Sequence, residues 1–460
     1  MSTSRGLTAA RPHLTFLVGM CSAVGLAWHL ESRAMQRAPS HAASDDAGGV
    51  EIVFPDATAA DALDHQRLPE RPVGVALSES ELRQARIAWR YFENNYNEAT
   101  GLVNSADRYP STTLWDLGSY AMGLLAAEDL GIIDAETFDT RMGKLLGSLA
   151  ALPLVDGALP NKAYNTRTLE MVNYSNEAVE GGIGWSAIDV ARLSVPLTIT
   201  LWRHPRFTER IQSVLSGWRL DEATAAGELQ GAEREPSTGA LTRVQEGRFG
   251  YEEYAAKAMF LLGSDVDVAI QYDHRVGVTT VSGQPILYDA RDPAEHDGTH
   301  NAVVSEPYVL EAIEYGLTSV TRPIAEAVYL AQRSRYEGTG VLTAVSEDNI
   351  DRPPHFVYNA VYNDGEAWAA FTPSGAPAHE HRAVSLKAAL GWAALFDDGY
   401  AATLRAAVSG LNDPERGWYS GRYEADGATN AILTANTNGI VLELLWYRAR
   451  GPLLPAARTP

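Results

Sequence analysis

The sequence predicts an all-α protein, an (α/α)6 toroid or six-hairpin barrel, with long loops and small β-hairpins. About eleven stretches place apolar residues at helical spacing, as expected for successive antiparallel helix pairs around a ring. The loops between them are long and rich in Gly, Asn, Asp, Pro and aromatic residues. The chain shows neither the strand–helix alternation of a doubly wound sheet or TIM barrel nor the fixed short period of an α-solenoid.

The N-terminal segment, residues 1–42, has the pattern of a signal peptide or signal-anchor. Arg5 and Arg11 precede an apolar run at 13–30, and the SHA before Ala43 fits a cleavage site. We therefore expect an exported protein in the periplasm or cell envelope. If the segment is retained, it would tether the protein to the membrane.

The folded domain is expected to span residues 78–450, after a linker at 43–77 and before a flexible tail at 451–460. It begins with a capping box, in which Ser78 accepts a backbone N–H and Glu81 reaches back to the start of the helix. The predicted helices cover residues 79–96, 113–130, 135–150, 185–201, 207–218, 252–263, 306–316, 322–336, 382–396, 399–410 and 436–449.

Three of the loops are too long to be simple connections, at 152–184, 264–305 and 338–381. Loops of this length in a compact domain are usually functional. Short strand-like pieces, VGVTTV at 276–281 and GVLTAV at 340–345, predict small hairpins rather than a larger sheet.

Composition excludes several classes of function. The 37 Lys and Arg residues against 58 Asp and Glu give a net charge of −21, which disfavours nucleic acid and anionic lipid surfaces. The single cysteine, Cys21, leaves the folded domain without a disulfide or a cysteine metal cluster. His296 and His300 are spaced as HxxxH but lack the helical HExxH pattern, and no nucleophile elbow, P-loop or dinucleotide fingerprint is present. We expect no metal and no cofactor.

Several acidic residues occur in settings that suit sugar hydrolysis, which needs paired carboxylates and aromatic faces. Glu252 and Glu253 lie in GYEEYAAK at a loop-to-helix junction, where the alternative is that they complement the helix dipole. Glu306 in VVSEPY has helix capping as its alternative. Glu347 and Asp348 precede two prolines, so their alternative is turn formation.

Candidate sugar-binding residues are aromatic or lie beside aromatic residues. Asp116 follows Trp115 inside an otherwise apolar helical pattern, so it either caps a ring helix or faces a ligand. Most aromatic residues at such spacing belong to the core. The candidates for substrate binding are Trp115, Asp116, Trp185, Tyr251, Tyr254, Tyr308 and Tyr358.

From about residue 78 to 450 the chain resembles the bacterial domain-of-unknown-function family numbered three-one-three-one. The strings that carry this resemblance are WDLGSY, LPNKAYNT, IGWSAIDVARL, EGRFGYEEYAAK, YDARDP, VVSEPY, TAVSEDNIDRPPHFVYN and LTANTNGIVLE. The resemblance implies an α/α-toroid and an envelope location.

A second resemblance is to the glucoamylase-like domains of endo-β-1,2-glucanases and cyclic β-1,2-glucan synthases. It rests on the acid-aromatic pair Glu253-Tyr254 and on the segment Ser305-Glu306-Pro307-Tyr308. By that similarity Glu253 would be the general acid, with Glu252 as the alternative, and Glu306 would be the nucleophile or second carboxylate.

The sequence thus favours a glycoside hydrolase or transglycosylase acting on an envelope or extracellular glucan, with β-1,2-glucan as the leading candidate. Glu253 would be the acid, Glu306 the nucleophile or base, and Asp348 a reserve base. One alternative is a non-catalytic protein that binds oligo- or polysaccharide or assists polysaccharide export. A lyase or epimerase using Tyr254 and His355 is the other.

Overall fold

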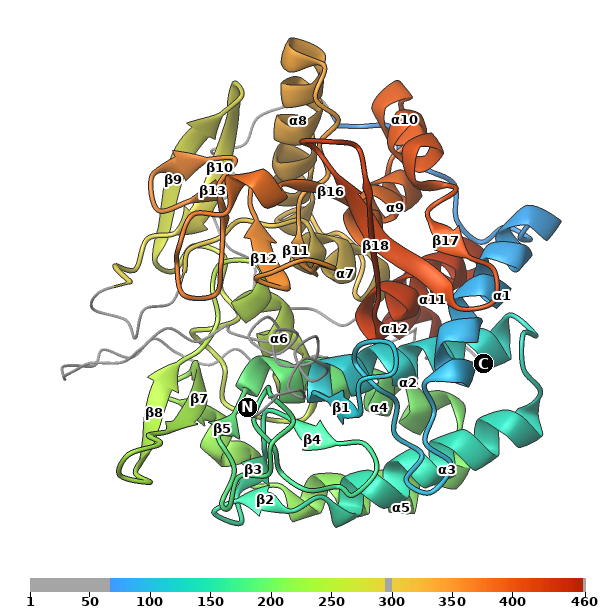
Figure 1. Ribbon diagram of the computed structural model, residues 1–460, viewed down its shortest axis with the longest axis vertical. Coiled ribbons are helices and arrows are strands. Elements are labelled where there is room, and N and C mark those ends of the chain that lie inside the picture. Colours follow the sequence, from blue (N-terminus) through green and yellow to red (C-terminus); the bar gives the residue numbers. More distant parts are fainter. Residues whose placement is uncertain (1–66, 294–299, 458–460) are drawn as a thin grey trace, which may run out of the picture.

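The computed structural model describes residues 67–293 and 300–457, so the predicted signal segment 1–42, most of the predicted linker and His296 lie outside the described residues. Within these ranges the fold is rich in helix, and every predicted helical stretch contains one (Figure 1). The helices are α1 (Glu79–Asn94), α2 (Leu114–Asp129), α3 (Ala135–Ala151), α4 (Ala187–Arg203), α5 (Thr208–Gly217), α6 (Tyr251–Leu261), α7 (Glu306–Glu314), α8 (Thr321–Thr339), α9 (Leu386–Leu395), α10 (Gly399–Val408), α11 (Ala435–Arg450) and α12 (Leu453–Ala457).

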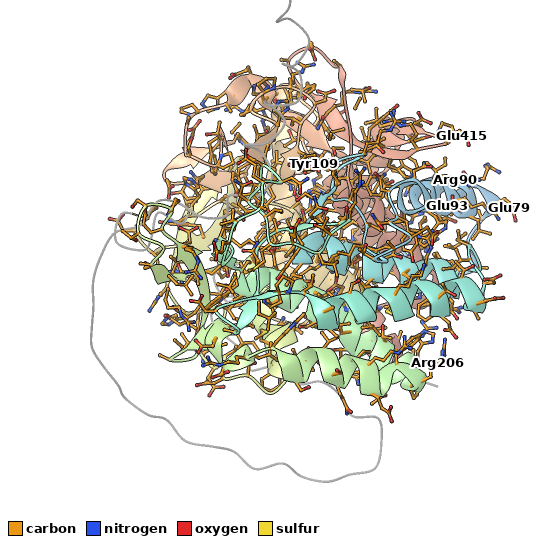
Figure 2. The ribbon with its side chains drawn as sticks, turned by 60° about the horizontal axis from the view of Figure 1, so that its bottom comes forward. Glu79, Arg90, Glu93, Tyr109, Arg206 and Glu415 are labelled. Atoms are coloured by element: carbon orange, nitrogen blue, oxygen red, sulfur yellow. The ribbon has the colours of Figure 1, made fainter. Side chains whose placement is uncertain are left out.

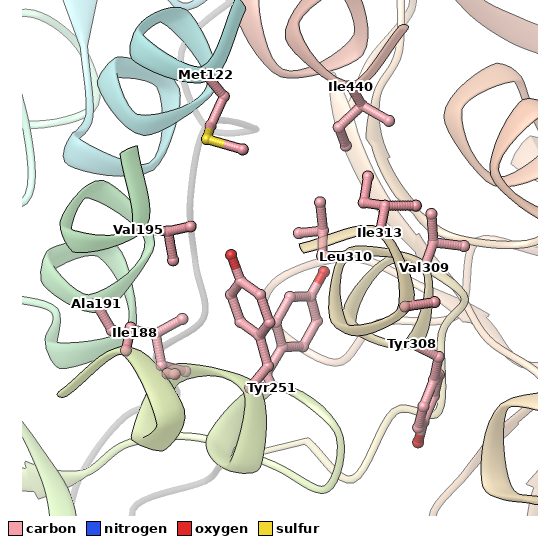
Figure 3. Close-up of a cluster of buried hydrophobic side chains, with 14 of the residues drawn as sticks. Met122, Ile188, Ala191, Val195, Tyr251, Tyr308, Val309, Leu310, Ile313 and Ile440 are labelled. Carbon is pink, nitrogen blue, oxygen red and sulfur yellow. The ribbon is translucent and has the colours of Figure 1, made fainter. Parts of the chain in front are cut away.

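Six helices form the centre of the fold: α2, α4, α6, α7, α9 and α11 are buried along most of their lengths. Each contacts the next in chain order, and α11 returns to contact α2, so the contacts form a closed circle. Figure 3 shows the side chains of Met122, Val195, Leu310 and Ile440 from four of these helices in one buried cluster. An apolar surface on every side is what a helix needs in this position.

The other long helices, α1, α3, α5, α8 and α10, lie outside this circle and are amphipathic. In α1 the buried face includes Trp89 and Phe92. Glu79, Arg90 and Glu93 project from the outer side of the same helix (Figure 2). The charged face therefore meets solvent while the apolar stripe packs on α11 and α2.

Between α6 and α7 the outer position is taken by a hairpin rather than a helix. Its strands β9 (Val276–Val281) and β10 (Gln284–Asp289) pair antiparallel, and β10 packs on α8. This confirms the hairpin predicted from VGVTTV. The strand prediction for GVLTAV at 340–345 is wrong, because these residues form no strand. Ala344 and Val345 accept single hydrogen bonds from the N–H groups of Ser385 and Ser305 instead of forming a ladder with a partner strand.

The loops contain more β-structure than the sequence predicts. One four-stranded sheet joins β5 (Gly184–Trp185), β6 (Thr224–Ala225), β7 (Glu228–Arg234) and β8 (Leu241–Gln245). Another joins β16 (Ala383–Ser385), β17 (Asn412–Asp413), β18 (Gly417–Tyr423) and β19 (Thr429–Leu433), and a three-stranded sheet joins β11 (Glu347–Asn349), β12 (Phe356–Asn359) and β15 (Ala370–Phe371). Two-stranded pairs join β1 (Ser111–Thr112) with β4 (Tyr164–Asn165), β2 (Leu154–Val155) with β3 (Leu159–Pro160), and β13 (Tyr362–Asn363) with β14 (Glu366–Ala367).

Buried loops need such pairing because backbone polar groups away from water must find partners. Strands β5 and β7 come so close at Gly184 that no side chain fits there. Gly184 has φ +117, and a Cβ at this position would lie 1.9 Å from the carbonyl oxygen of Ala232. Only glycine allows β5 and β7 to meet at this point.

Both ends of the domain extend beyond their predicted limits. The segment before α1 already packs at Leu68, whose backbone N–H donates to Glu326, and at Arg71, whose backbone N–H donates to Leu395. The predicted flexible tail begins with α12, whose Leu453 and Leu454 are buried against α4, α7 and α11. The burial of these two leucines holds the tail against the circle of inner helices. In the described part of the chain, no helix combines the length and apolarity needed to cross a membrane.

Candidate active site

A cavity of about 120 Å³ lies where the N-terminal ends of the inner helices meet. By this measure one water needs about 10–15 Å³, so the cavity holds several waters or part of a sugar ring. All six inner helices contribute a side chain from their first turn. The lining residues on helices are Trp115, Asp116, Ile188, Asp189, Tyr251, Glu306, Lys387 and Asn436, and those on loops and strands are Thr113, Ser186, Glu246, Arg248, Glu347, Asp348, Asn349, Phe356, Tyr358 and Thr434.

Two of the acids in the cavity, Asp116 and Asp189, are each held by the N-cap residue of their helix. Thr113 and Ser186 are the N-cap residues of α2 and α4, and their hydroxyls accept the backbone N–H of Asp116 at 3.1 Å and of Asp189 at 3.1 Å. A Ser or Thr cap followed three residues later by an acid fixes that acid in the first helical turn. The partial positive charge at a helix N-terminus also favours a carboxylate there.

Lys387 lies between two carboxylates of the cavity lining. Its ammonium group forms a close ion pair with Glu306 and lies 3.5 Å from Asp348. The amide of Asn436 donates to the other oxygen of Glu306 at 2.8 Å. Burial raises the pKa of Asp348 to about 7, although Lys387 acts in the opposite direction. One oxygen of Glu306 is therefore ion-paired with Lys387, and the other accepts from Asn436.

Asp189, Glu246 and Asp116 are further carboxylates in the lining of the same cavity. Burial, together with the charges of Glu246 and Asp116, raises the pKa of Asp189 to about 8. Burial also raises the pKa of Glu246, which accepts the backbone N–H of Ala187 at the start of α4. The pKa of Asp116 is raised by burial despite hydrogen bonds from Ser105 and Thr113. Of these three carboxyl groups, Asp189 is therefore the one placed to hold a proton at neutral pH.

Aromatic rings form part of the wall. The rings of Trp115 and Tyr251 meet edge to face with centroids 5.6 Å apart. Arg248 lies 5.0 Å from the Tyr251 ring and 5.2 Å from the Tyr358 ring, and its guanidinium donates to Glu347 at 2.6 Å. Acids, aromatic faces and a positioned arginine form a surface suited to binding sugars.

The structure does not bring Glu253 and Glu306 together. Glu306 lines the cavity, but the Glu253 carboxylate turns back and accepts the backbone N–H of Gly250 at 2.6 Å. Glu252 pairs with Arg291, and both glutamates line a separate space of about 10 Å³, enough for about one water. The assignment of Glu253 or Glu252 as the acid facing Glu306 therefore needs correction, because helix capping holds Glu253 away from the cavity.

The other predicted site residues fall into two groups, those that line the cavity and those that do not. Asp348, Asp116, Trp115, Tyr251 and Tyr358 line the cavity.

Three predicted sugar-binding aromatics do not line the cavity. Trp185 is buried, donates to the carbonyl of Gln230 at 3.2 Å and packs on Arg243. Tyr308 is buried, and its ring packs closely on Gly250. These two side chains, like Tyr254, belong to the core.

Tyr254 and His355, the pair required by a lyase or epimerase, lie apart from the cavity lining. Tyr254 is in the buried centre of the ring, where it donates to Glu314 at 2.8 Å. His355 belongs to the turn after the two prolines, and its N–H donates to Arg352. His300 packs on Phe371 with ring centroids 4.8 Å apart.

Beneath the floor of the cavity lies a fully buried charge network. Arg192 of α4 contacts Glu314 of α7 and Glu443 of α11, and all three side chains are 0% exposed. The Tyr254 hydroxyl joins them, accepting from Arg192 at 3.1 Å. Arg192 also lies 5.7 Å from the ring of Trp115, so the network supports the cavity floor.

Sequence reasoning missed several lining residues, among them Asp189, Glu246, Arg248, Lys387 and Asn436. A signal existed for the first, because Ser186-x-x-Asp189 repeats the Thr113-x-x-Asp116 pattern at the start of a predicted inner helix. Lys387 offered no such signal, since it is a lysine in a strongly apolar helix and depends on ion pairs made through the fold.

Fold and site together define a helix-rich protein with an acid-lined cavity at the N-terminal ends of a circle of buried helices. The chain matches the family described as protein of unknown function (DUF3131) over residues 83–451, and it belongs to that family. No curated protein matches it.

Solved structures share its fold at low sequence identity. A provisionally assigned glucoamylase from Bacteroides caccae is 13% identical, with a TM-score of 0.57 over 87% of this chain and 96% of that one. The endo-β-1,2-glucanase of Chitinophaga pinensis, in complex with sophorotriose and glucose, is 11% identical, with a TM-score of 0.59 over 84% and 96%. The endo-β-1,2-glucanase of Talaromyces funiculosus, in complex with sophorose, is 12% identical, with a TM-score of 0.55 over 82% and 85%.

Proposed function

We propose that this protein is a glycoside hydrolase that acts on a glucan in the cavity at the helix N-termini. The observation that carries the proposal is the division of the cavity acids. Asp189 has a pKa raised to about 8, whereas Glu306, in the lining of the same cavity, is paired with Lys387 and Asn436. Cleavage of a glycosidic bond needs one carboxyl group that donates a proton and a second that acts as base or nucleophile.

In this mechanism Asp189 is the general acid. Its proton passes to the glycosidic oxygen as the bond from that oxygen to the anomeric carbon breaks. Glu306 acts on the opposite side of the sugar ring, either by accepting a proton from the attacking water or by attacking the anomeric carbon itself. Asp348, which shares Lys387 with Glu306, is the reserve base. Asp116, Trp115, Tyr251 and Tyr358 bind the sugar.

The substrate class follows from the charge of the cavity. Six carboxyl groups line it against two cations, Arg248 and Lys387, so a neutral glycan is favoured over an anionic one. Among neutral glucans we propose the β-1,2-linked class, because solved relatives in fold hold sophorose or sophorotriose. We further propose that the closed circle of inner helices with its outer helices is an (α/α)6 toroid, and that the protein acts in the periplasm or cell envelope.

The test is to incubate the purified protein with linear and cyclic glucans of several linkages and to measure new reducing ends. We expect Asp189→Asn and Glu306→Gln to lose about 10²- to 10⁴-fold in rate, since each removes one step of acid–base catalysis. Glu209→Gln, on the exposed surface of α5, is the matched control. A large loss in Glu253→Gln together with full activity in Asp189→Asn would return the acid role to Glu253.

A second candidate is a glycan-binding protein without catalysis, and the buried lysine favours it. Lys387 pairs with Glu306 and Asp348 together, so both carboxylates are partly neutralised in the unliganded protein. The same panel separates the two candidates. Saturable binding of a glucan without any new reducing ends would establish the binding role and reject the hydrolase.

A further inference from the structure

A second cavity, of about 70 Å³, lies between α1, α9, α10 and α11, away from the acidic site. These helices lie side by side on the right of Figure 1, and their contacts agree. The cavity is lined by the C-terminal halves of α9 and α11, whereas the acidic site uses the first turns of the same helices. The two sites therefore share helices but no lining residues.

The charges around this cavity are unusual for a protein with a net charge of −21. Three arginines, Arg71, Arg405 and Arg448, line it together with only one carboxylate, Glu81. Arg71 contacts Glu81 at 3.3 Å, and Arg448 lies 3.8 Å from the same oxygen. The other Glu81 oxygen accepts from Ser78 in the capping box. One carboxylate therefore serves two guanidinium groups and leaves the third without a counter-charge among the lining residues.

Two of the arginines have unused donors. The Nε and Nη1 atoms of Arg448 are shielded from solvent and make no hydrogen bond within the described residues. Arg405, in α10, is half-buried and makes no ion pair or hydrogen bond to any described residue, so only the Arg448 donors are both buried and without a partner. Buried donors without partners are costly, and most such groups in native proteins are satisfied. Arg71 donates to the carbonyl of Ala393 near the end of α9, and Arg405 and Arg448 lie in the last turns of α10 and α11. A cation in these places complements the helix dipole, but the dipole gives the N–H groups of Arg448 no hydrogen-bond acceptor.

The floor of the cavity is aliphatic. It consists of Leu390, Ala393, Ala394, Val441, Leu444 and Leu445. A guanidinium group binds carboxylate and phosphate oxygens through paired N–H donors, and an aliphatic floor favours a ligand with an apolar part. The volume admits about five to seven water-sized groups, so the ligand portion inside is short.

We propose that this cavity binds an oxyanion, a carboxylate or a phosphate, that carries a short aliphatic group. The oxyanion lies among Arg71, Arg405 and Arg448, and the aliphatic part lies on the floor of leucine and alanine side chains. The site is independent of the proposed hydrolysis, because the two cavities share no lining residue.

The probes are butyl phosphate, hexanoate and inorganic phosphate, titrated into the full chain by calorimetry. We expect saturable binding of butyl phosphate and hexanoate that is tighter than binding of inorganic phosphate and weakens with salt. Arg405→Gln should weaken it about tenfold or more, as expected when one charge-assisted contact is lost. The control Arg86→Gln, exposed on α1, should bind as the unmodified protein does.

Arg405→Gln removes no hydrogen bond or ion pair to a described residue, so it is expected to keep the melting temperature, which is measured alongside. Co-sedimentation with phosphatidylglycerol vesicles separates the sources of the ligand. Arg405-dependent sedimentation identifies a lipid headgroup, and calorimetric binding without sedimentation identifies a soluble anion. The proposal is overturned if neither organic anion binds saturably, or if Arg405→Gln and Arg86→Gln bind equally well.

Discussion

Replacing Arg192 with methionine should destabilise the protein more than any surface change, because it leaves Glu314 and Glu443 buried without their cation. All three side chains are 0% exposed, so water cannot replace the lost partner. Removing one member of a buried ion pair costs about 3–5 kcal/mol. For a domain of this size we expect the melting temperature to fall by about 5 °C or more at pH 7.

The stability lost in the Arg192→Met variant should increase as the pH rises. Burial holds the pKa of Glu443 well above its usual range, even with Arg192 beside it. Without Arg192 we expect the two glutamates of the folded variant to hold one proton more than they hold in the folded parent. In the unfolded chain both glutamates ionise above about pH 4.3. Folding then takes up a proton, so the deficit grows by about 1.4 kcal/mol per pH unit and shrinks as the pH falls towards 5.

Thermal denaturation of the Arg192→Met variant and the parent at pH 5, 6, 7 and 8 measures both effects. Arg86→Met, an exposed arginine on α1, is the control and should melt with the parent. The reasoning fails if Arg192→Met melts at the parent temperature at pH 7, or if its deficit is the same at pH 5 and pH 8.

Four further outcomes follow from the structure. Glucan hydrolysis should fall above about pH 8 as Asp189 loses its proton, and a rate that keeps rising to pH 10 would contradict its role as the acid. Lys387→Met should lower the rate of reducing-end release while glucan binding measured by calorimetry persists, since it removes the cation shared by Glu306 and Asp348. Leu454→Ala should cost about 2–5 kcal/mol in chemical denaturation, because this α12 side chain is fully buried, and no loss would mean that α12 is detached. Gly184→Ala should melt several degrees lower than Gly157→Ala, because a Cβ at Gly184 meets a backbone oxygen at 1.9 Å, whereas Gly157 at φ +67 has open space; equal melting temperatures would count against this packing.

The helices could be predicted from the sequence because their apolar periodicity and caps are local. The capping box at Ser78 and Glu81, for example, is present as predicted, with both of its hydrogen bonds. The sheets could not, because pairs such as β5 with β7 join short segments across long loops and have no pattern of their own. α12 was missed because two leucines near a chain end carry no periodicity, and only the ring of inner helices gives them a place to pack.

The site was only half predictable for a similar reason. Asp116, Glu306 and Asp348 lie in the cavity as proposed, because each is in or beside a predicted helix start or turn. Glu253 has the same local pattern, but its carboxylate caps its own helix, and local sequence does not distinguish a capping acid from one facing a ligand. Most missed lining residues, including Asp189 and Glu246, lie in the strings that carry the family resemblance, in IGWSAIDVARL and EGRFGYEEYAAK.

The closure of the inner circle between α2 and α11 has a consequence for how the chain reaches its native state. Ser119 and Asn436 meet by a hydrogen bond at 3.0 Å although 317 positions separate them. Helix α11, which carries Asn436, is synthesised after the other five inner helices. Until α11 is made, the earlier inner helices expose surfaces that have no partner, so we expect slow assembly and a tendency to aggregate at that stage. A chain cut short before residue 435 would lack α11, which closes the circle by contacting α2, and would also lack Asn436, a hydrogen-bond partner of Glu306.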